Sequence, residues 1–239
     1  IPKLPVNLAL VKGYSLVGVF WGAFTRKEPE VFADNMRELM GWAVDGSVRP
    51  HVSERAKLAD AADILRRMHD RQTTGKIVLV PYDAASAGPK PTARSRVRTQ
   101  DIPFPETSMS AIPDTMQALV LKYDGYSGTA EGPTIEDLKD WVSLEEIAVP
   151  KPEGRQALVR IGLANINPSD LHYIKGEYGQ PRRKGVAAGF EAMGEVVAAG
   201  EDPAAAKLVG QRVAVSVART GTGAWAQYAL TDAGAVVPL

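Results

Sequence analysis

The sequence predicts an α+β protein in which a short α/β segment is joined by a linker to a partly closed β-barrel. Residues 1–81 read as strand, helix, helix and strand. Residues 82–115 are rich in proline, serine and alanine. From Met116 onward, short β-rich runs alternate with Gly and Pro turns. We therefore expect three parts, with boundaries at 1–81, 82–115 and 116–239.

The first part is predicted to hold two helices between two strands. Residues 14–21 form an unbroken apolar run, which is typical of a strand buried on both faces. A helix is expected to begin at Glu28-Pro29, with proline at its first position, and to end at Gly46. A second helix over 58–70 carries apolar residues at helical spacing. Residues 75–81 then close this part as a strand.

The linker, residues 82–115, is expected to be a solvated spacer that proteases reach. Its basic residues have no interleaved aromatic side chains, so they argue against an arm that binds nucleic acid.

The third part is predicted to be mostly strands. One helical turn at Pro168–Leu171 interrupts the β pattern, with Ser169 or Asp170 able to cap it. Functional sites concentrate where regular structure is interrupted, so we expect the site there. The predicted strands are 117–123, 141–149, 156–164, 191–199, 212–217 and 225–230.

Composition excludes several classes of function. Lys plus Arg number 28 and Asp plus Glu number 28, so no net field favours nucleic acid or an acidic membrane surface. With no cysteine, the chain has no disulfides, thiolate zinc sites, iron–sulfur clusters or cysteine nucleophile. No export signal or membrane segment is recognisable, which predicts a cytoplasmic protein.

Common catalytic and nucleotide motifs are also missing from the sequence. His51, His69 and His172 are scattered without metal-ligand spacing, so no metal site is expected. There is no serine nucleophile elbow and no Walker loop. Gly221-Thr222-Gly223 lacks the further glycine of a dinucleotide fingerprint and reads as a tight turn.

Two motifs in the third part carry a family resemblance. They are Asn167-Pro168-Ser169-Asp170, followed by Gly176-Glu177-Tyr178, and Gly189-Phe190-Glu191. This part resembles the GroES-like catalytic domain of the medium-chain dehydrogenase/reductase superfamily. Zinc members carry a Cys in the first motif and Gly-His-Glu in the second. Both ligand types are replaced here, so the resemblance implies the zinc-independent branch of quinone oxidoreductases and 2-enoyl thioester reductases.

The first part resembles the other end of the same superfamily. Residues 5–13 and 17–22 are similar to the last part of its cofactor-binding Rossmann domain, and residues 74–79 to its closing strand. The C-terminal segment thus precedes the N-terminal domain, and most of the Rossmann domain is absent between them. A permuted chain, a domain-deleted chain and a fusion across neighbouring genes all remain open. We expect Lys76–Pro81 to pair with the catalytic domain.

The resemblance implies an NAD(P)H-dependent oxidoreductase that reduces a quinone, a conjugated enone or a 2-enoyl thioester, with NADPH as cofactor. Tyr178 is implied as the proton donor, and Asn167 as the residue that orients the nicotinamide. Phe20, Trp21 and Lys76 are implied as further cofactor contacts. From the residues alone, the preferred interpretation is that Tyr178 packs beside Gly179 and that Asn167 caps the helical turn.

Two alternatives from other classes follow from the missing glycine fingerprint. One is a non-catalytic module that binds or assembles, because the pyrophosphate of a dinucleotide loses its main anchor without that motif. The other is half of a split enzyme, completed by a partner chain that supplies a cofactor domain. We expect a small-molecule substrate and either a homo-oligomer, such as a dimer, or such a partner.

Overall fold

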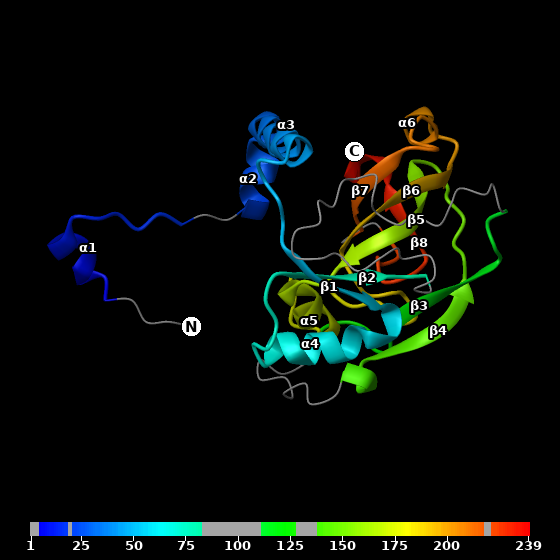
Figure 1. Cartoon of the computed structure of the whole chain (residues 1–239), viewed down its shortest axis with the longest axis horizontal. Helices are drawn as coiled ribbons and strands as arrows, with labels where there is room; N and C mark the ends of the chain where they lie inside the picture. The colour runs from blue at the N-terminus through cyan, green and yellow to red at the C-terminus, as the bar shows by residue number, and fades with distance from the viewer. Residues whose placement is uncertain (1–4, 19–20, 83–110, 128–137, 218–220) are drawn as a thin grey trace. The chain divides into compact units, whose positions relative to one another are not determined.

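The structure is a computed structural model that describes residues 5–18, 21–82, 111–127, 138–217 and 221–239 (Figure 1). The predicted linker lies almost entirely outside the described residues. The chain forms two compact units, Ile1–Arg49 and Pro50–Leu239. The closing segment of the predicted first part therefore belongs to the same unit as residues 111–239.

The first unit consists of helices α1 (Asn7–Lys12), α2 (Trp21–Lys27) and α3 (Pro29–Asp45). Helix α3 confirms the predicted helix: Pro29 occupies its first turn, and Gly46 ends it in the left-handed conformation at φ 81°. None of the residues of α1 or α3 is buried. The unit therefore exposes apolar side chains on its helices, Leu10 and Val44 among them.

The predicted strand over 14–21 is wrong. Residues 14–18 are irregular and exposed, and Trp21 begins α2. Val17, for instance, is 79% exposed. A buried strand requires neighbouring strands that take up its backbone hydrogen bonds, and the described part of this unit contains none.

The second unit begins with a parallel βαβ arrangement: β1 (Val52–Lys57), η1 (Leu58–Asp60), α4 (Ala61–His69) and β2 (Lys76–Val80). It confirms the predicted helix over 58–70 and the predicted strand over 75–81. Helix α4 buries Ala61, Ile64 and Leu65. Burial of each large apolar side chain stabilises the fold by roughly 1.5–3 kcal/mol.

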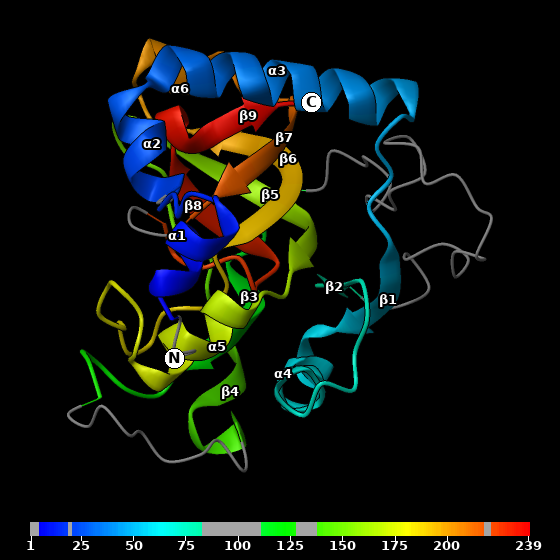
Figure 2. The same ribbon diagram turned by 90° about the vertical axis from the view of Figure 1, so that its left-hand side faces the viewer.

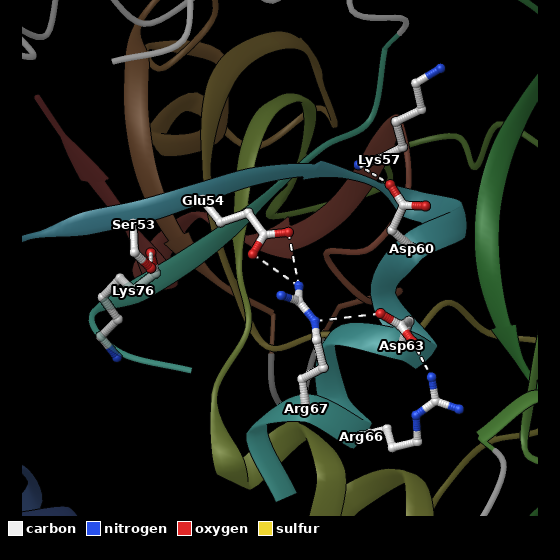
Figure 3. A network of polar contacts seen from close by, with 8 residues as sticks. All are labelled: Ser53, Glu54, Lys57, Asp60, Asp63, Arg66, Arg67 and Lys76. Carbon is white, nitrogen blue, oxygen red and sulfur yellow. Dashed lines mark hydrogen bonds and ion pairs between the residues drawn. The ribbon is translucent and has the colours of Figure 1, made fainter. Parts of the chain in front are cut away.

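Figure 3 shows how α4 is also held to β1 on its polar side. Arg67 donates two hydrogen bonds to the Glu54 carboxylate, at 2.8 and 2.9 Å, and its Nε lies 3.4 Å from Asp63. Both hydrogen bonds come from the one nitrogen Nη2. Partly exposed ion pairs of this kind contribute only about 0–1 kcal/mol to stability.

The central sheet of the second unit has seven strands in the order β1-β2-β5-β6-β7-β9, with β8 also paired to β5. A separate two-stranded sheet pairs β3 with β4. All six predicted strands are present, although the last begins at Tyr228; β1 and β9 were not predicted. The bounds are β3 Thr115–Leu121, β4 Val142–Ala148, β5 Gln156–Asn165, β6 Glu191–Ala199, β7 Arg212–Ser216, β8 Tyr228–Asp232 and β9 Val236–Pro238.

The strands curve around a core without closing into a complete barrel, as predicted (Figure 2). Isolated bridges attach β3 to the rest of the unit, between Ala118 and Ala226 and between Val120 and Ala187. Helices α5 (Pro168–Lys175) and α6 (Pro203–Ala206) and the short turns η4 (Leu138–Asp140) and η5 (Ala233–Ala235) lie between strands. Helix α5 packs against α4. The chain is thus an α+β protein with a partly closed GroES-like β-domain.

Strand β2 joins the early segment to the β-domain. It pairs antiparallel with the end of β5, where Val78 lies opposite Asn165 and Leu79 opposite Ala164. The two segments also share one apolar core, in which Leu65 and Leu79 pack in the same cluster as Trp225. The expected pairing of Lys76–Pro81 with the third part is therefore present, and the segment from Pro50 belongs to the same unit as the β-domain.

Candidate functional site

The site is organised around the N-terminus of α5. Pro168 occupies the first turn, and Asn167 is the N-cap with extended backbone. Asp170, three residues further on, accepts a hydrogen bond from the Asn167 backbone N–H at 2.7 Å, which completes a capping box. The predicted single turn is thus a helix of eight residues whose N-cap is Asn167. Of the two predicted capping residues, Ser169 and Asp170, Asp170 takes part through the capping box.

Asp170 also connects the helix to Phe190, the residue that precedes β6. Its Oδ1 accepts a hydrogen bond from the backbone N–H of Phe190 at 3.1 Å, and the residue is completely buried. Burial raises the pKa of the Asp170 carboxyl from 3.8 to about 7, and the charge of Glu191 adds to this effect, while Lys76 opposes it. One side chain therefore fixes both family motifs relative to each other.

Three residues from three elements meet beside this helix start, and we call them the Lys76–Asn167–Glu191 cluster. Lys76 Nζ donates to Asn167 Oδ1 at 2.9 Å, and Asn167 Nδ2 donates to Glu191 Oε2 at 3.0 Å. Because a cation binds its oxygen and a carboxylate its nitrogen, the orientation of the Asn167 carboxamide is fixed. The structure thus brings together two predicted cofactor contacts, Lys76 and Asn167.

Phe190, the residue before Glu191, packs against two tyrosines. Its ring centroid lies 4.8 Å from that of Tyr173 and 5.2 Å from that of Tyr178. Tyr178 is 40% exposed. The hydrogen bonds described for the Asn167 side chain go to Lys76 and Glu191, and the role of Tyr178 as proton donor stays a prediction.

A pocket of about 410 Å³ lies beside the same aromatic side chains. Phe190, Val186 and Val217 give it apolar walls, and Gly179 and Gln180, which follow Tyr178, line it as well. Gly189, at φ 88°, also lines it; a Cβ there would lie 2.2 Å from the Trp225 ring, so this position accepts only glycine. The pocket and the Lys76–Asn167–Glu191 cluster therefore flank one segment, 189–191.

The remaining predicted cofactor contacts lie in the first unit. Trp21 packs on Phe24 and Phe32, with ring centroids 5.3 and 5.8 Å apart. Phe20 lies outside the described residues. Their predicted role stays a prediction.

The residues in the two metal-ligand positions do not fit a zinc ion. Phe190 has no donor atom and packs against two aromatic rings, and Asn167 and Asp170 are already engaged in hydrogen bonds. Among the described residues, no group of three or more His, Cys, Asp or Glu side chains is arranged to hold a metal. The described part of the chain also contains no helix long and apolar enough to cross a membrane.

Comparison with known proteins agrees with this architecture. Residues 153–239 match the alcohol dehydrogenase GroES-like domain, and residues 5–79 match the zinc-binding dehydrogenase family. Both are domains of dehydrogenases. The chain belongs to the medium-chain dehydrogenase/reductase superfamily, with the domain matches in the order that the resemblance predicted.

The chain is similar to prostaglandin reductase-3 of Bos taurus, with 35% identity over 131 residues that cover 54% of this chain and 31% of the relative. It is 29% identical to quinone oxidoreductase-like protein 2 of Bos taurus over 33% of this chain and 23% of the relative. The solved structure of a protein assigned as an NADPH:quinone reductase, from Mesorhizobium loti, is 47% identical with a TM-score of 0.52, covering 54% of this chain and 38% of that one. The chain thus spans about a third of the length of these relatives.

Three features of the site were not predicted from the sequence. The role of Glu191 in holding Asn167 depends on a contact between residues far apart in sequence. The burial of Asp170 had a local signal, because an acidic residue three positions after a capping Asn is the spacing of a capping box. The pocket lining by Arg183 had no signal in a stretch that reads as a polar loop.

Proposed function

We propose that this chain provides the catalytic domain of a zinc-independent, NADPH-dependent oxidoreductase that reduces a quinone, a conjugated enone or a 2-enoyl thioester. The observation that carries the proposal is the Lys76–Asn167–Glu191 cluster beside a pocket walled by Phe190. The names of the relatives, prostaglandin reductase and quinone oxidoreductase, support the reaction class. A cytoplasmic location and a dimer are parts of the same proposal.

The residues of the chain divide the chemistry among them. A bound nicotinamide supplies the hydride. The carboxamide of Asn167, held by Lys76 and Glu191, offers fixed hydrogen-bonding groups to a planar amide. Tyr178, half exposed beside Phe190, donates a proton or hydrogen bond to the oxygen on which negative charge develops. Phe190 makes the site apolar where a zinc-dependent relative would place a metal ligand. In this proposal the hydrogen-bond donor Tyr178 therefore takes the place of the metal as the electrophile.

Fluorescence titration with NADPH tests the proposal. We expect saturable binding that weakens at least several-fold in Asn167→Ala, with Lys184→Gln as a control that removes an exposed charge outside the pocket lining. Reduction of a quinone or an enoyl thioester is expected once a dinucleotide-binding domain from a relative is added. Failure of NADPH binding and turnover even in the complemented mixture would refute the proposal.

A second candidate is a binding or assembly module without catalysis. It is favoured by the absence of a dinucleotide glycine fingerprint from the sequence. Half of a split enzyme is the related alternative, and the complemented titration separates the two, because only the split enzyme gains turnover when the cofactor domain is supplied.

A further inference from the structure

Two adjacent arginines follow Pro181, and the fold uses them differently. The guanidinium of Arg182 is buried and donates to the backbone carbonyls of Gly125, Ile174 and Asp124 at 3.0–3.2 Å. It also lies over the rings of Tyr123 and Trp141. Arg182 is therefore fully occupied in holding the loop to the β-domain.

Arg183 instead lines the 410 Å³ pocket. Of the pocket-lining residues that the structure describes, it alone carries a full charge. Its Nη2 donates to the Gly221 carbonyl, and it interacts with Tyr173, where its charge partly offsets the rise in the tyrosine pKa that burial causes. No described carboxylate forms an ion pair with it.

This arrangement leaves a cation available at an apolar pocket. A guanidinium has five N–H donors in a planar fork that matches a carboxylate or a phosphate, and the described contacts of Arg183 use only part of them. The Gly221 carbonyl holds one end of the fork at the pocket wall, which reduces the entropy lost when an anion binds. Phe190, whose ring contacts Tyr178, lines the same pocket and gives it an aromatic surface.

We propose that Arg183 determines substrate specificity by binding an anionic group, a carboxylate or a phosphate, on a substrate whose apolar part fills the pocket beside Phe190. The identification of this ligand as the substrate rests on the proposed function; the anion site itself does not. The class of substrate is then an enone, quinone or enoyl compound that carries a negative charge at a distance from its reacting double bond.

A matched set of ligands tests the anion site directly. Benzalacetone is an uncharged conjugated enone, and its para-carboxy and para-phosphate derivatives add only the anion. Calorimetric titration of the full chain with each, in the absence of NADPH, measures the preference for charge. We expect the better of the two anionic ligands to bind wild type about tenfold or more tightly than benzalacetone, because hydrogen bonds between charged groups are the strong class. Which of the two binds better identifies the anion.

Variants assign the preference to one residue. Arg183→Gln is expected to remove the preference and leave the affinity for benzalacetone unchanged, and Arg183→Lys to keep part of it, because Lys lacks the planar fork. Lys184→Gln removes the neighbouring charge outside the pocket lining and is expected to keep the full preference. A melting curve for each variant shows that the fold is retained.

Equal affinity of wild type for the charged and the uncharged ligands would overturn the inference. Absence of binding by both anionic ligands would also overturn it. A preference that survives in Arg183→Gln or disappears in Lys184→Gln would also overturn it. Since these titrations contain no cofactor, they are independent of whether NADPH binds or hydride is transferred. If wild type shows no preference for the anionic ligands but still reduces its substrate, this inference alone is refuted and the proposed function stands.

Discussion

The buried carboxyl of Asp170 gives the fold a pH dependence that can be measured. Because its pKa is raised in the folded protein, the folded state holds the proton more tightly than the unfolded chain. The stability this gives is fully present below the unfolded pKa of 3.8 and is lost as the pH rises through about 7. From these two values, the wild-type free energy of unfolding falls by roughly 2–3 kcal/mol between pH 5 and pH 8 on account of this group.

Asp170→Asn removes the titration and keeps the size of the side chain. The variant is expected to lack this fall between pH 5 and pH 8. At pH 5 it is expected to be less stable than wild type by about 1–3 kcal/mol, because the amide has one acceptor oxygen for the two backbone N–H groups of Asn167 and Phe190. At pH 8 the difference shrinks, because wild type then carries a buried charge.

Urea unfolding followed by far-UV circular dichroism at both pH values measures the effect. Asp202→Asn is the matched control: Asp202 is also a helix-capping carboxylate, accepting from the Ala204 N–H at 2.8 Å, but it lies near the surface on α6. This control should keep the wild-type pH dependence. Equal pH dependence in wild type and Asp170→Asn would refute the reasoning.

Three further predictions concern other parts of the second unit. Tyr178→Phe is expected to lower turnover in the complemented enzyme by roughly a hundredfold with little change in melting temperature; unchanged turnover would remove the donor assignment. Gly189→Ala is expected to lower the free energy of unfolding by at least about 2 kcal/mol, and with it the melting temperature, because the new Cβ would meet the Trp225 ring and φ at this position is positive. A native-like melting curve would contradict this. Glu195→Gln is expected to cost about 3–5 kcal/mol in urea unfolding, since it leaves the buried Arg160, now 2.8 Å from that carboxylate, uncompensated; a cost below about 1 kcal/mol would show that solvent reaches the pair.

Local sequence signals predicted most elements of the second unit, because its strands are buried and rich in β-branched residues and its helices have clear ends. Strand β1 was missed because Val52–Lys57 is largely charged and lies at the edge of the sheet, where apolar alternation is weak. The run at 14–21 failed for the opposite reason. An apolar run indicates burial only if partners exist, and that information is not local.

The candidate site was also predicted only where the signal in the sequence is local. The motif around Asn167 located the helix start, and the residue types in the two motifs predicted that zinc ligands are missing. The contact between Lys76 and Asn167, however, spans 91 positions and depends on the pairing of β2 with β5. Neither the partner that orients the Asn167 carboxamide nor the exposed state of Arg183 in the pocket follows from spacing along the chain.

The pairing of β2 with β5 also has a consequence for synthesis on the ribosome. The β1–α4–β2 segment is translated before the β-domain, and Asn165, which lies opposite Val78, is translated 87 positions later than its partner. At about 5–20 residues per second, this delay is roughly 4–17 s. Throughout that interval the free edge of β2 and the apolar face of α4, with Ile64 and Leu65, have no partner in the nascent chain. Recruitment of a chaperone to this segment is therefore expected before the β-domain emerges.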